Sequence, residues 1–295
     1  MTEIFGVPAP ALLGQLLVGL VNGAFYAMLS LGLAVIFGLL NIINFAHGAQ
    51  YMVGAILTWV LLDRTGLSYW WALVLVPLAV AALAAAIERG MLRQLYSLDH
   101  LYGLLLTFGV ALMMQGLLTN FFGSSGLPYV LPEEFSGAFD LGFMMLPRYR
   151  AWVVVASVVV CTATVLVIER TKLGSYLRAA TENPLVVRAF GINVPRMITF
   201  TYAFGAGLAA LAGVMAAPIY QISPQMGADL IIVVFAVVVV GGMGSIVGAI
   251  VTGYALGVVE ALTKVYYAPA ANTVIFVIMA IVLLVKPAGL FGKEK

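Results

Sequence analysis

Nine stretches of the chain are apolar for about the length that a helix needs to cross the hydrocarbon core of a bilayer, roughly 20 residues. Because lipid offers the backbone no hydrogen-bond partners, each such stretch predicts a helix. We therefore expect an all-α polytopic membrane protein with eight or nine transmembrane helices. The count stays open because 230–262 reads either as two helices or as one interrupted near Gly242. The stretches are 12–39, 45–62, 69–88, 101–122, 151–168, 197–217, 230–243, 245–262 and 268–285.

The overall composition agrees with a membrane protein. Of the 295 residues, 63 % are hydrophobic and 9 % are charged, whereas a soluble domain is about a quarter charged. So few charges exclude a cytosolic enzyme, a disordered chain and a secreted disulfide scaffold. The single cysteine, Cys161, cannot form a disulfide within the chain. The two histidines, His47 and His100, have no cysteine partners at metal-ligand spacing, so we expect no metal site and no cofactor.

Basic residues are distributed unevenly between the loops, and this predicts the orientation. Cytoplasmic loops carry an excess of Lys and Arg. Residues 169–196 hold five of the 14 basic residues, 89–99 hold two and the C-terminal tail holds three, which leaves four elsewhere. We therefore expect the 169–196 loop and the C-terminus on the cytoplasmic side, with the N-terminus and the 123–150 loop on the outer side.

We expect one or two short helices in the 169–196 loop, outside the membrane. Asn183 has the residue type of an N-cap, and Pro184 follows at the first helical position, where its missing N–H does no harm. Gly191 is placed to end the helix in the left-handed conformation. A helix this short does not persist alone in water. It must dock, either at the membrane interface of its own bundle or on a partner.

A second polar segment lies between two apolar stretches, at residues 41–50. It contains Asn41, Asn44, His47 and Gln50. An unpaired polar side chain in hydrocarbon costs on the order of several kcal/mol, so these groups either pair between helices or line a translocation path. The glycines Gly242 and Gly244, which would allow a solute to pass close to the backbone, are candidates for the same path.

Small residues recur at a spacing that lets helices approach closely in lipid. Gly19 and Gly23 are four residues apart, as are Gly253 and Gly257. The sequence at 53–58 returns almost unchanged at 247–252, which indicates an internal repeat, although chance in a restricted alphabet is the alternative. Glu260 is the only acid well inside a predicted span, and it lies near that helix's end.

The chain lacks the motifs that carry bond-making chemistry. It has no phosphate-binding G-x-x-x-x-G-K-[ST] loop, no H-E-x-x-H and no arrangement of Ser, His and Asp typical of hydrolases. We therefore expect that the chain is not an enzyme and does not itself bind ATP. A membrane-embedded enzyme is disfavoured for the same reason.

Five segments in order along the chain resemble the membrane permease subunits of branched-chain amino-acid ABC importers of the LivH type. The most specific are NFAHG in the first segment, RAATEN with GIN in the second and GGMGSIVGA in the fourth. The resemblance covers nearly the whole chain. The segments are 19–55, 172–197, 207–218, 237–253 and 286–292.

The resemblance implies a type II-like importer permease, with residues 1–295 as a single transmembrane domain. It implies a second permease subunit, two cytoplasmic ATPase subunits that bind ATP, a periplasmic substrate-binding protein and a location in the bacterial inner membrane. It also implies that 172–197 is the loop that couples to an ATPase subunit. The candidate coupling residues are Arg178, Glu182, Asn183, Pro184, Arg188 and Gly191.

Several functions stay open at this point. The resemblance implies transport of leucine, isoleucine and valine, but permeases for urea or short amides are similar. A stand-alone secondary carrier or channel is the alternative from another class. The scarcity of intramembrane acids argues against an ion-coupled carrier, because such carriers need a charged or titratable site.

Overall fold

The chain forms two compact units. The computed structural model describes residues 3–4, 6–40 and 44–292. The first unit comprises Met1–Ser30, Leu131–Cys161 and Val233–Lys295, and the second comprises Leu31–Val130 and Thr162–Ile232. Three helices contribute residues to both units. The expectation of one domain over 1–295 stays a prediction.

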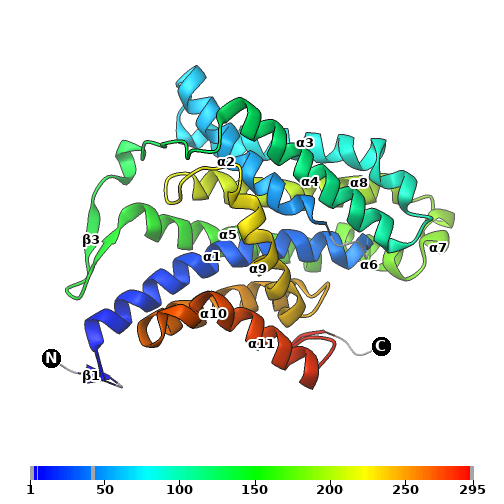
Figure 1. The fold of residues 1–295 in the computed structure, drawn as a ribbon. Coiled ribbons are helices and arrows are strands. Elements are labelled where there is room, and N and C mark those ends of the chain that lie inside the picture. The colour runs from blue at the N-terminus through cyan, green and yellow to red at the C-terminus, as the bar shows by residue number, and fades with distance from the viewer. Residues whose placement is uncertain (1–2, 5, 41–43, 293–295) are drawn as a thin grey trace. The chain divides into compact units, whose positions relative to one another are not determined.

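Nine long helices account for most of the described chain (Figure 1). Seven helices among the described residues are long and apolar enough to cross a membrane, and α2 and α9 lie outside that group. If these two also cross, the total is nine, in agreement with the expected eight or nine. The long helices are α1 (Ala9–Leu40), α2 (Ala46–Thr65), α3 (Tyr69–Gly90), α4 (His100–Phe122), α5 (Arg148–Arg170), α8 (Val194–Ala216), α9 (Met226–Gly241), α10 (Ile246–Tyr266) and α11 (Ala271–Val285).

Shorter elements fill the connections. Two helices, α6 (Lys172–Glu182) and α7 (Pro184–Ala189), occupy the basic loop, and two antiparallel strand pairs lie outside the long helices. The pairs are β1 (Glu3–Ile4) with β2 (Val7–Pro8) and β3 (Ala138–Asp140) with β4 (Met145–Pro147). Three short 3-10 turns complete the set, namely η1 (Leu92–Leu95), η2 (Glu133–Phe135) and η3 (Ala268–Ala270).

The structure resolves the ambiguity at 230–262 in favour of two helices. Gly242 and Gly244 have φ angles of 100° and 87°, a region that residues with a Cβ rarely enter. The helix therefore ends at Gly241. Ser245 then caps α10 by accepting a hydrogen bond from the Gly248 N–H at 3.1 Å, so a new helix begins within a few residues.

In the first unit, small residues bring α1 and α10 into backbone contact. A Cβ on Gly257 would overlap the backbone of Gly23, and one on Gly19 would lie 2.9 Å from Ala261 Cβ. The two predicted glycine pairs thus face each other. Glu260 on the same contact is buried, and it accepts hydrogen bonds from the Tyr26 hydroxyl and the Lys264 ammonium, each at 2.6 Å.

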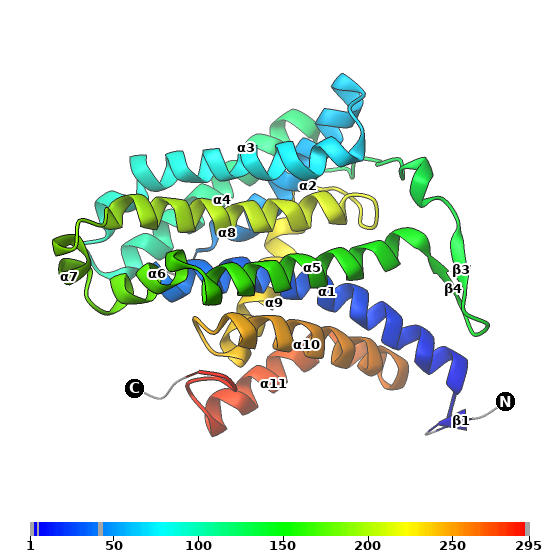
Figure 2. The same cartoon turned by 180° about the vertical axis from the view of Figure 1, so that it is seen from behind.

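In the second unit, α8 packs against α2 and α3, and α4 packs against α2 (Figure 2). Small residues again mark the contacts, because a Cβ on Gly54 would overlap Ala210. A core cluster forms where the helices meet: it contains Ile36, Ala84, Leu92, Tyr202 and Ala206. Much of α4 is exposed and apolar, as expected for a helix that faces lipid or another membrane subunit.

The α1–α10 contact predicts how a single methyl group changes stability. Gly257→Ala places a Cβ into the Gly23 backbone, and we expect the separation of the helices to cost about 1–3 kcal/mol. Gly116→Ala on α4 is the matched control, because no atom lies within 4 Å of the added Cβ. The thermal midpoint of the detergent-purified chain measures both. Equal midpoints for the two variants would contradict the close contact.

Candidate functional site

The polar segment before α2 forms a buried group in the second unit. Asn44, His47 and Gln50 are each at most 1 % exposed. The Tyr202 hydroxyl of α8 donates to Asn44 Oδ1 at 3.2 Å, and a Cβ on Gly32 of α1 would lie 2.9 Å from His47 Cε1. These predicted path residues are therefore brought together where α1, α2 and α8 meet. Asn41 lies outside the described residues.

Some polar atoms of this group are buried without a partner. Neither side-chain polar atom of Gln50 has a hydrogen-bond partner within the described part of the chain, and the same holds for Asn44 Nδ2 and Thr201 Oγ1. Native structures leave few buried polar groups unsatisfied, and each calls for an explanation. A solute or water that reaches these amides in another state would supply the missing hydrogen bonds.

An apolar cavity of about 180 Å³ lies beside the same helix. Phe45, the residue before α2, lines it together with Ala49 and Met52 of α2, and their spacing of three to four residues marks one helix face. Opposite them stand residues of α4 and α9, including Phe108 and Ile231. The start of α2 thus has a polar face toward α1 and α8 and an apolar face toward this cavity.

The other two predicted path residues lie in the first unit. Gly242 is packed against the C-terminal segment, since a Cβ there would lie 2.5 Å from the Gly292 nitrogen. The Leu290 and Phe291 N–H groups donate to the Val240 and Gly241 carbonyls at 2.8 and 3.1 Å. The segments 237–253 and 286–292 therefore form one structural element. Gly244 lies in the same break between α9 and α10.

The predicted coupling residues form two short helices as expected. The Asn183 side chain accepts hydrogen bonds from the Leu185 and Val186 N–H groups at 3.2 and 3.1 Å, and Pro184 is the first residue of α7. Gly191 has a φ of 78° and ends the turn. The N-cap, the proline at the first helical position and the left-handed glycine expected for the short helix are thus present.

α7 exposes apolar side chains although it lies outside the long helices. Leu185 and Phe190 are 72 % and 79 % exposed, and Val186 is also exposed, whereas Val187 is buried against the chain. Glu182 and Arg188 are exposed on the same segment. Large apolar groups on a short, charged loop form a surface that either the membrane interface or a partner would cover.

The loop is anchored to its own unit at several points. Arg178 donates to the Ile168 carbonyl at 3.1 Å, and Gly174 packs against the same backbone. A cavity of about 220 Å³ separates the loop from the η1–α4 turn, with Thr181 and Pro184 on one side and Tyr96 on the other. The loop is therefore fixed at α5 and α8. A cavity lies between the loop and the η1–α4 turn.

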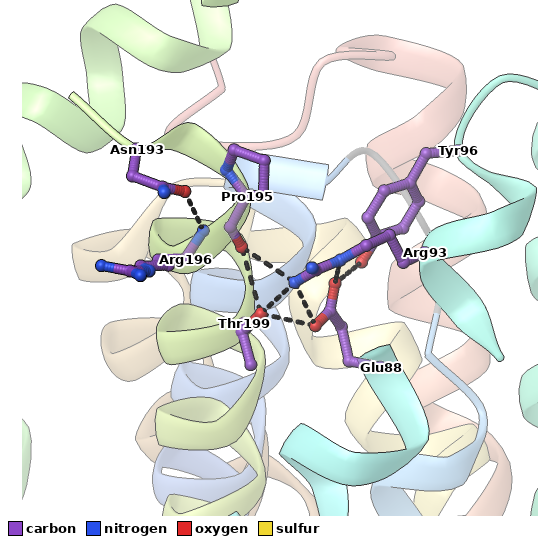
Figure 3. A network of polar contacts seen from close by, with 7 residues as sticks. All are labelled: Glu88, Arg93, Tyr96, Asn193, Pro195, Arg196 and Thr199. Atoms are coloured by element: carbon purple, nitrogen blue, oxygen red, sulfur yellow. Dashed lines mark hydrogen bonds and ion pairs between the residues drawn. The ribbon is translucent and has the colours of Figure 1, made fainter. Parts of the chain in front are cut away.

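Sequence reasoning missed a cluster at the end of α3. We call it the Glu88 cluster; it comprises Glu88, Arg93, Tyr96, Thr199 and the Pro195 carbonyl (Figure 3). The only signal in the sequence was an acid at the last position of a predicted span followed by an arginine five residues later. That pattern resembles an ordinary exposed helix end, whereas Glu88 is completely buried.

Three side chains hold the Glu88 carboxylate. Arg93 donates to both carboxylate oxygens at 3.2 and 3.1 Å, the Tyr96 hydroxyl donates at 3.1 Å, and the Thr199 hydroxyl donates at 2.6 Å. Arg93 also donates to the Thr199 hydroxyl oxygen and, at 3.1 Å, to the Pro195 carbonyl. Burial and the nearby Glu88 carboxylate raise the pKa of Tyr96 well above its ordinary value, so its hydroxyl keeps the proton that it donates.

Comparison with known proteins assigns the chain to a family. A family model described as "Branched-chain amino acid transport system / permease component" matches residues 15–285. The permease protein LivH of the high-affinity branched-chain amino acid transport system of Escherichia coli (strain K12) is 30 % identical over 298 residues, covering 96 % of each chain.

Further relatives carry similar names. The corresponding permease protein BraD of Pseudomonas aeruginosa is 31 % identical over 296 residues, with 96 % of each chain covered. A probable branched-chain amino acid transport permease protein LivH of Methanocaldococcus jannaschii is 28 % identical, covering 90 % of this chain and 88 % of the relative. No solved structure matches. With its apolar helices and these matches along nearly its full length, the chain belongs to the branched-chain amino acid transport permease family.

Proposed function

We propose that this chain is the permease subunit of an ABC importer that carries branched-chain amino acids across a bacterial inner membrane. The relatives are named for branched-chain amino acid transport. The observation that carries the proposal is the exposed apolar surface of α7, held at the basic end of the second unit. In this proposal a partner subunit, and not the membrane interface, covers that surface.

In this proposal, α6 and α7 couple the permease to a cytoplasmic ATPase subunit. Leu185 and Phe190 would enter an apolar groove of that subunit, and Arg188 would pair with acids at its rim. The Asn183 cap and the left-handed Gly191 give the short helix a defined shape before it binds, which lowers the entropy lost on docking. The excess of Lys and Arg near this loop supports a cytoplasmic location for it and for the C-terminus.

The start of α2 would supply part of the path, with Asn44, His47 and Gln50 as neutral polar contacts. Uncharged amides and an imidazole can bind the ammonium and carboxylate of a zwitterion without trapping it. The apolar cavity at Phe45 and Phe108 favours a solute with an apolar side chain over urea. A second permease subunit would complete the path, and a periplasmic protein would deliver the solute.

The alternating movement would follow from ATP binding by the partner subunits. Closure of the two ATPase subunits would shift the docked α7 helices and change the tilt of the bundles. To move a two-state equilibrium from about 1:99 to 99:1 takes about 5.5 kcal/mol of differential binding. Contacts between glycine and alanine faces, without large interlocked side chains, suit such sliding.

The reconstituted complex tests the function. Vesicles containing this chain, its partner permease, the ATPase subunits and the binding protein should accumulate radiolabelled leucine when ATP is supplied. Vesicles with this chain alone should neither hydrolyse ATP nor accumulate leucine, because the chain has no ATP-binding motif. Accumulation by the chain alone, driven by an ion gradient, would instead support a secondary carrier.

The exposed face of α7 predicts which residues bind the ATPase subunit. Leu185→Glu and Phe190→Glu should each reduce co-purification of the ATPase subunit by about tenfold or more, since each places a charge in an apolar contact. Val130→Glu is the matched control, because Val130 is 75 % exposed in the 123–150 loop. Normal co-purification with both α7 variants would refute the coupling assignment.

The Gln50 amide has no hydrogen-bond partner in the part of the chain that the structure describes, and this predicts a conflict between stability and function. Gln50→Met keeps the shape but removes two buried polar atoms, so the fold should become more stable by about 1–3 kcal/mol. Leucine uptake should fall, because the amide is then missing from the path. Thermal midpoint and uptake are measured on the same preparation. A lower midpoint would show that the amide serves packing.

A further inference from the structure

We infer that the Glu88 cluster is the joint through which movement of α6 and α7 reaches α3 and α4. The inference rests on the proposed function, because it gives a route for the force that an ATPase subunit would apply to α7. Glu88, Arg93, Tyr96 and Thr199 are positioning residues in this account. They would act through the helices that they connect and would not touch the solute.

The cluster lies where the coupling loop returns to the bundle. The chain leaves α7, passes Gly191 and enters α8 at Val194. Asn193 accepts a hydrogen bond from the Arg196 N–H at 3.1 Å and so caps this end (Figure 3). Pro195 and Thr199, in the first turns of α8, are the residues that bind Arg93 and Glu88. A pull on the loop therefore acts first on the helix end that the cluster holds.

The cluster connects three elements through one buried charge. Glu88 lies in the last turn of α3, and its carboxylate accepts hydrogen bonds from Arg93 in η1 and Thr199 in α8. To separate α8 from α3 would take the Thr199 hydroxyl from the buried carboxylate and the Pro195 carbonyl from Arg93, which is unfavourable. These helix ends therefore move as one body, whereas the small-residue contacts elsewhere permit sliding.

Tyr96 extends the joint toward the loop. Its hydroxyl is bound to Glu88 at 3.1 Å, while its side chain lines the 220 Å³ cavity beneath Thr181 and Pro184. The same cavity is lined by Asp99 and His100, where α4 begins. Tyr96 thus lies between the coupling loop and two membrane helices.

A purely structural role and a transmitting role predict different results. If the cluster serves only folding, its loss lowers the amount of assembled complex, and ATP hydrolysis and uptake fall together. If it transmits movement, the complex assembles and hydrolyses ATP, but each hydrolysis moves less solute. The ratio of leucine transported to ATP hydrolysed therefore separates the two roles.

The experiment uses the assembled importer with Thr199→Val or Tyr96→Phe, which remove one hydroxyl each and keep the shape. We expect the amount of leucine transported per ATP hydrolysed to fall by about tenfold, because each variant loses a hydrogen bond to a charged group. The rate of ATP hydrolysis should stay within about twofold of normal. Thr58→Val is the matched control, because that buried hydroxyl donates only to Gly54 of its own helix. An unchanged ratio in both cluster variants, or hydrolysis and uptake that fall together, would overturn the inference.

A double variant tests whether the cluster acts as a unit. Thr199→Val combined with Glu88→Gln should reduce the ratio no further than the more severe single variant, since both remove the same joint. If the losses of the two single variants instead multiply in the double variant, the inference that the cluster acts as one joint is wrong. Should Glu88→Gln fail to assemble, Thr199→Val combined with Tyr96→Phe replaces it with the same expectation.

A second readout does not depend on which solute is carried. Spin labels at Ser97→Cys and Ser175→Cys, both exposed, report the separation of the η1–α4 turn and α6 after Cys161→Ala removes the natural thiol. With the cluster intact, the assembled complex should keep one narrow distance distribution when a nonhydrolysable ATP analogue is added. Thr199→Val should broaden it. A broad distance distribution with the intact cluster would overturn the inference that the cluster is a joint. If the distribution stays narrow but the complex takes up no leucine, only the proposed function is refuted.

Discussion

Close contact between small residues holds this permease together, and the rest of the structure depends on it. In lipid, apolar side chains gain little by turning toward one another, so helices associate where their surfaces fit closely. The backbone of Gly23 meets that of Gly257 in the first unit, and Gly54 meets Ala210 in the second. Such contacts place backbone against backbone, with no large interlocked side chains between the two helices.

Polar groups are few and serve distinct purposes. Glu260 is paired with Tyr26 and Lys264, and Glu88 is enclosed by donors, so the buried acids are compensated. The amide of Gln50, in contrast, is left without a partner in the described residues. A satisfied buried charge stiffens a structure, whereas an unsatisfied neutral group is one that a passing solute can use. This contrast separates the candidate joint from the candidate path.

The sequence predicted nearly all helix positions and the cap and turn of the short helix in the 169–196 loop. Apolar runs identified the nine long helices because a bilayer imposes both their length and their hydrogen bonding. The Asn183 cap and the Gly191 turn were also predictable, since they depend on bonds between near neighbours. The break at Gly242 was ambiguous, because two glycines indicate a turn but do not say whether the helix resumes at once.

Sequence by itself determined the membrane class, the helices and the charge asymmetry of the loops, because these follow from composition and local spacing. Only the tertiary structure decided that Glu88 is buried against Thr199, 111 positions away, and that the C-terminal Leu290 binds the Val240 carbonyl. Only it showed that the buried Gln50 amide has no hydrogen-bond partner among the described residues. Pairings between distant residues depend on how whole helices pack, and no local pattern in the chain encodes that geometry.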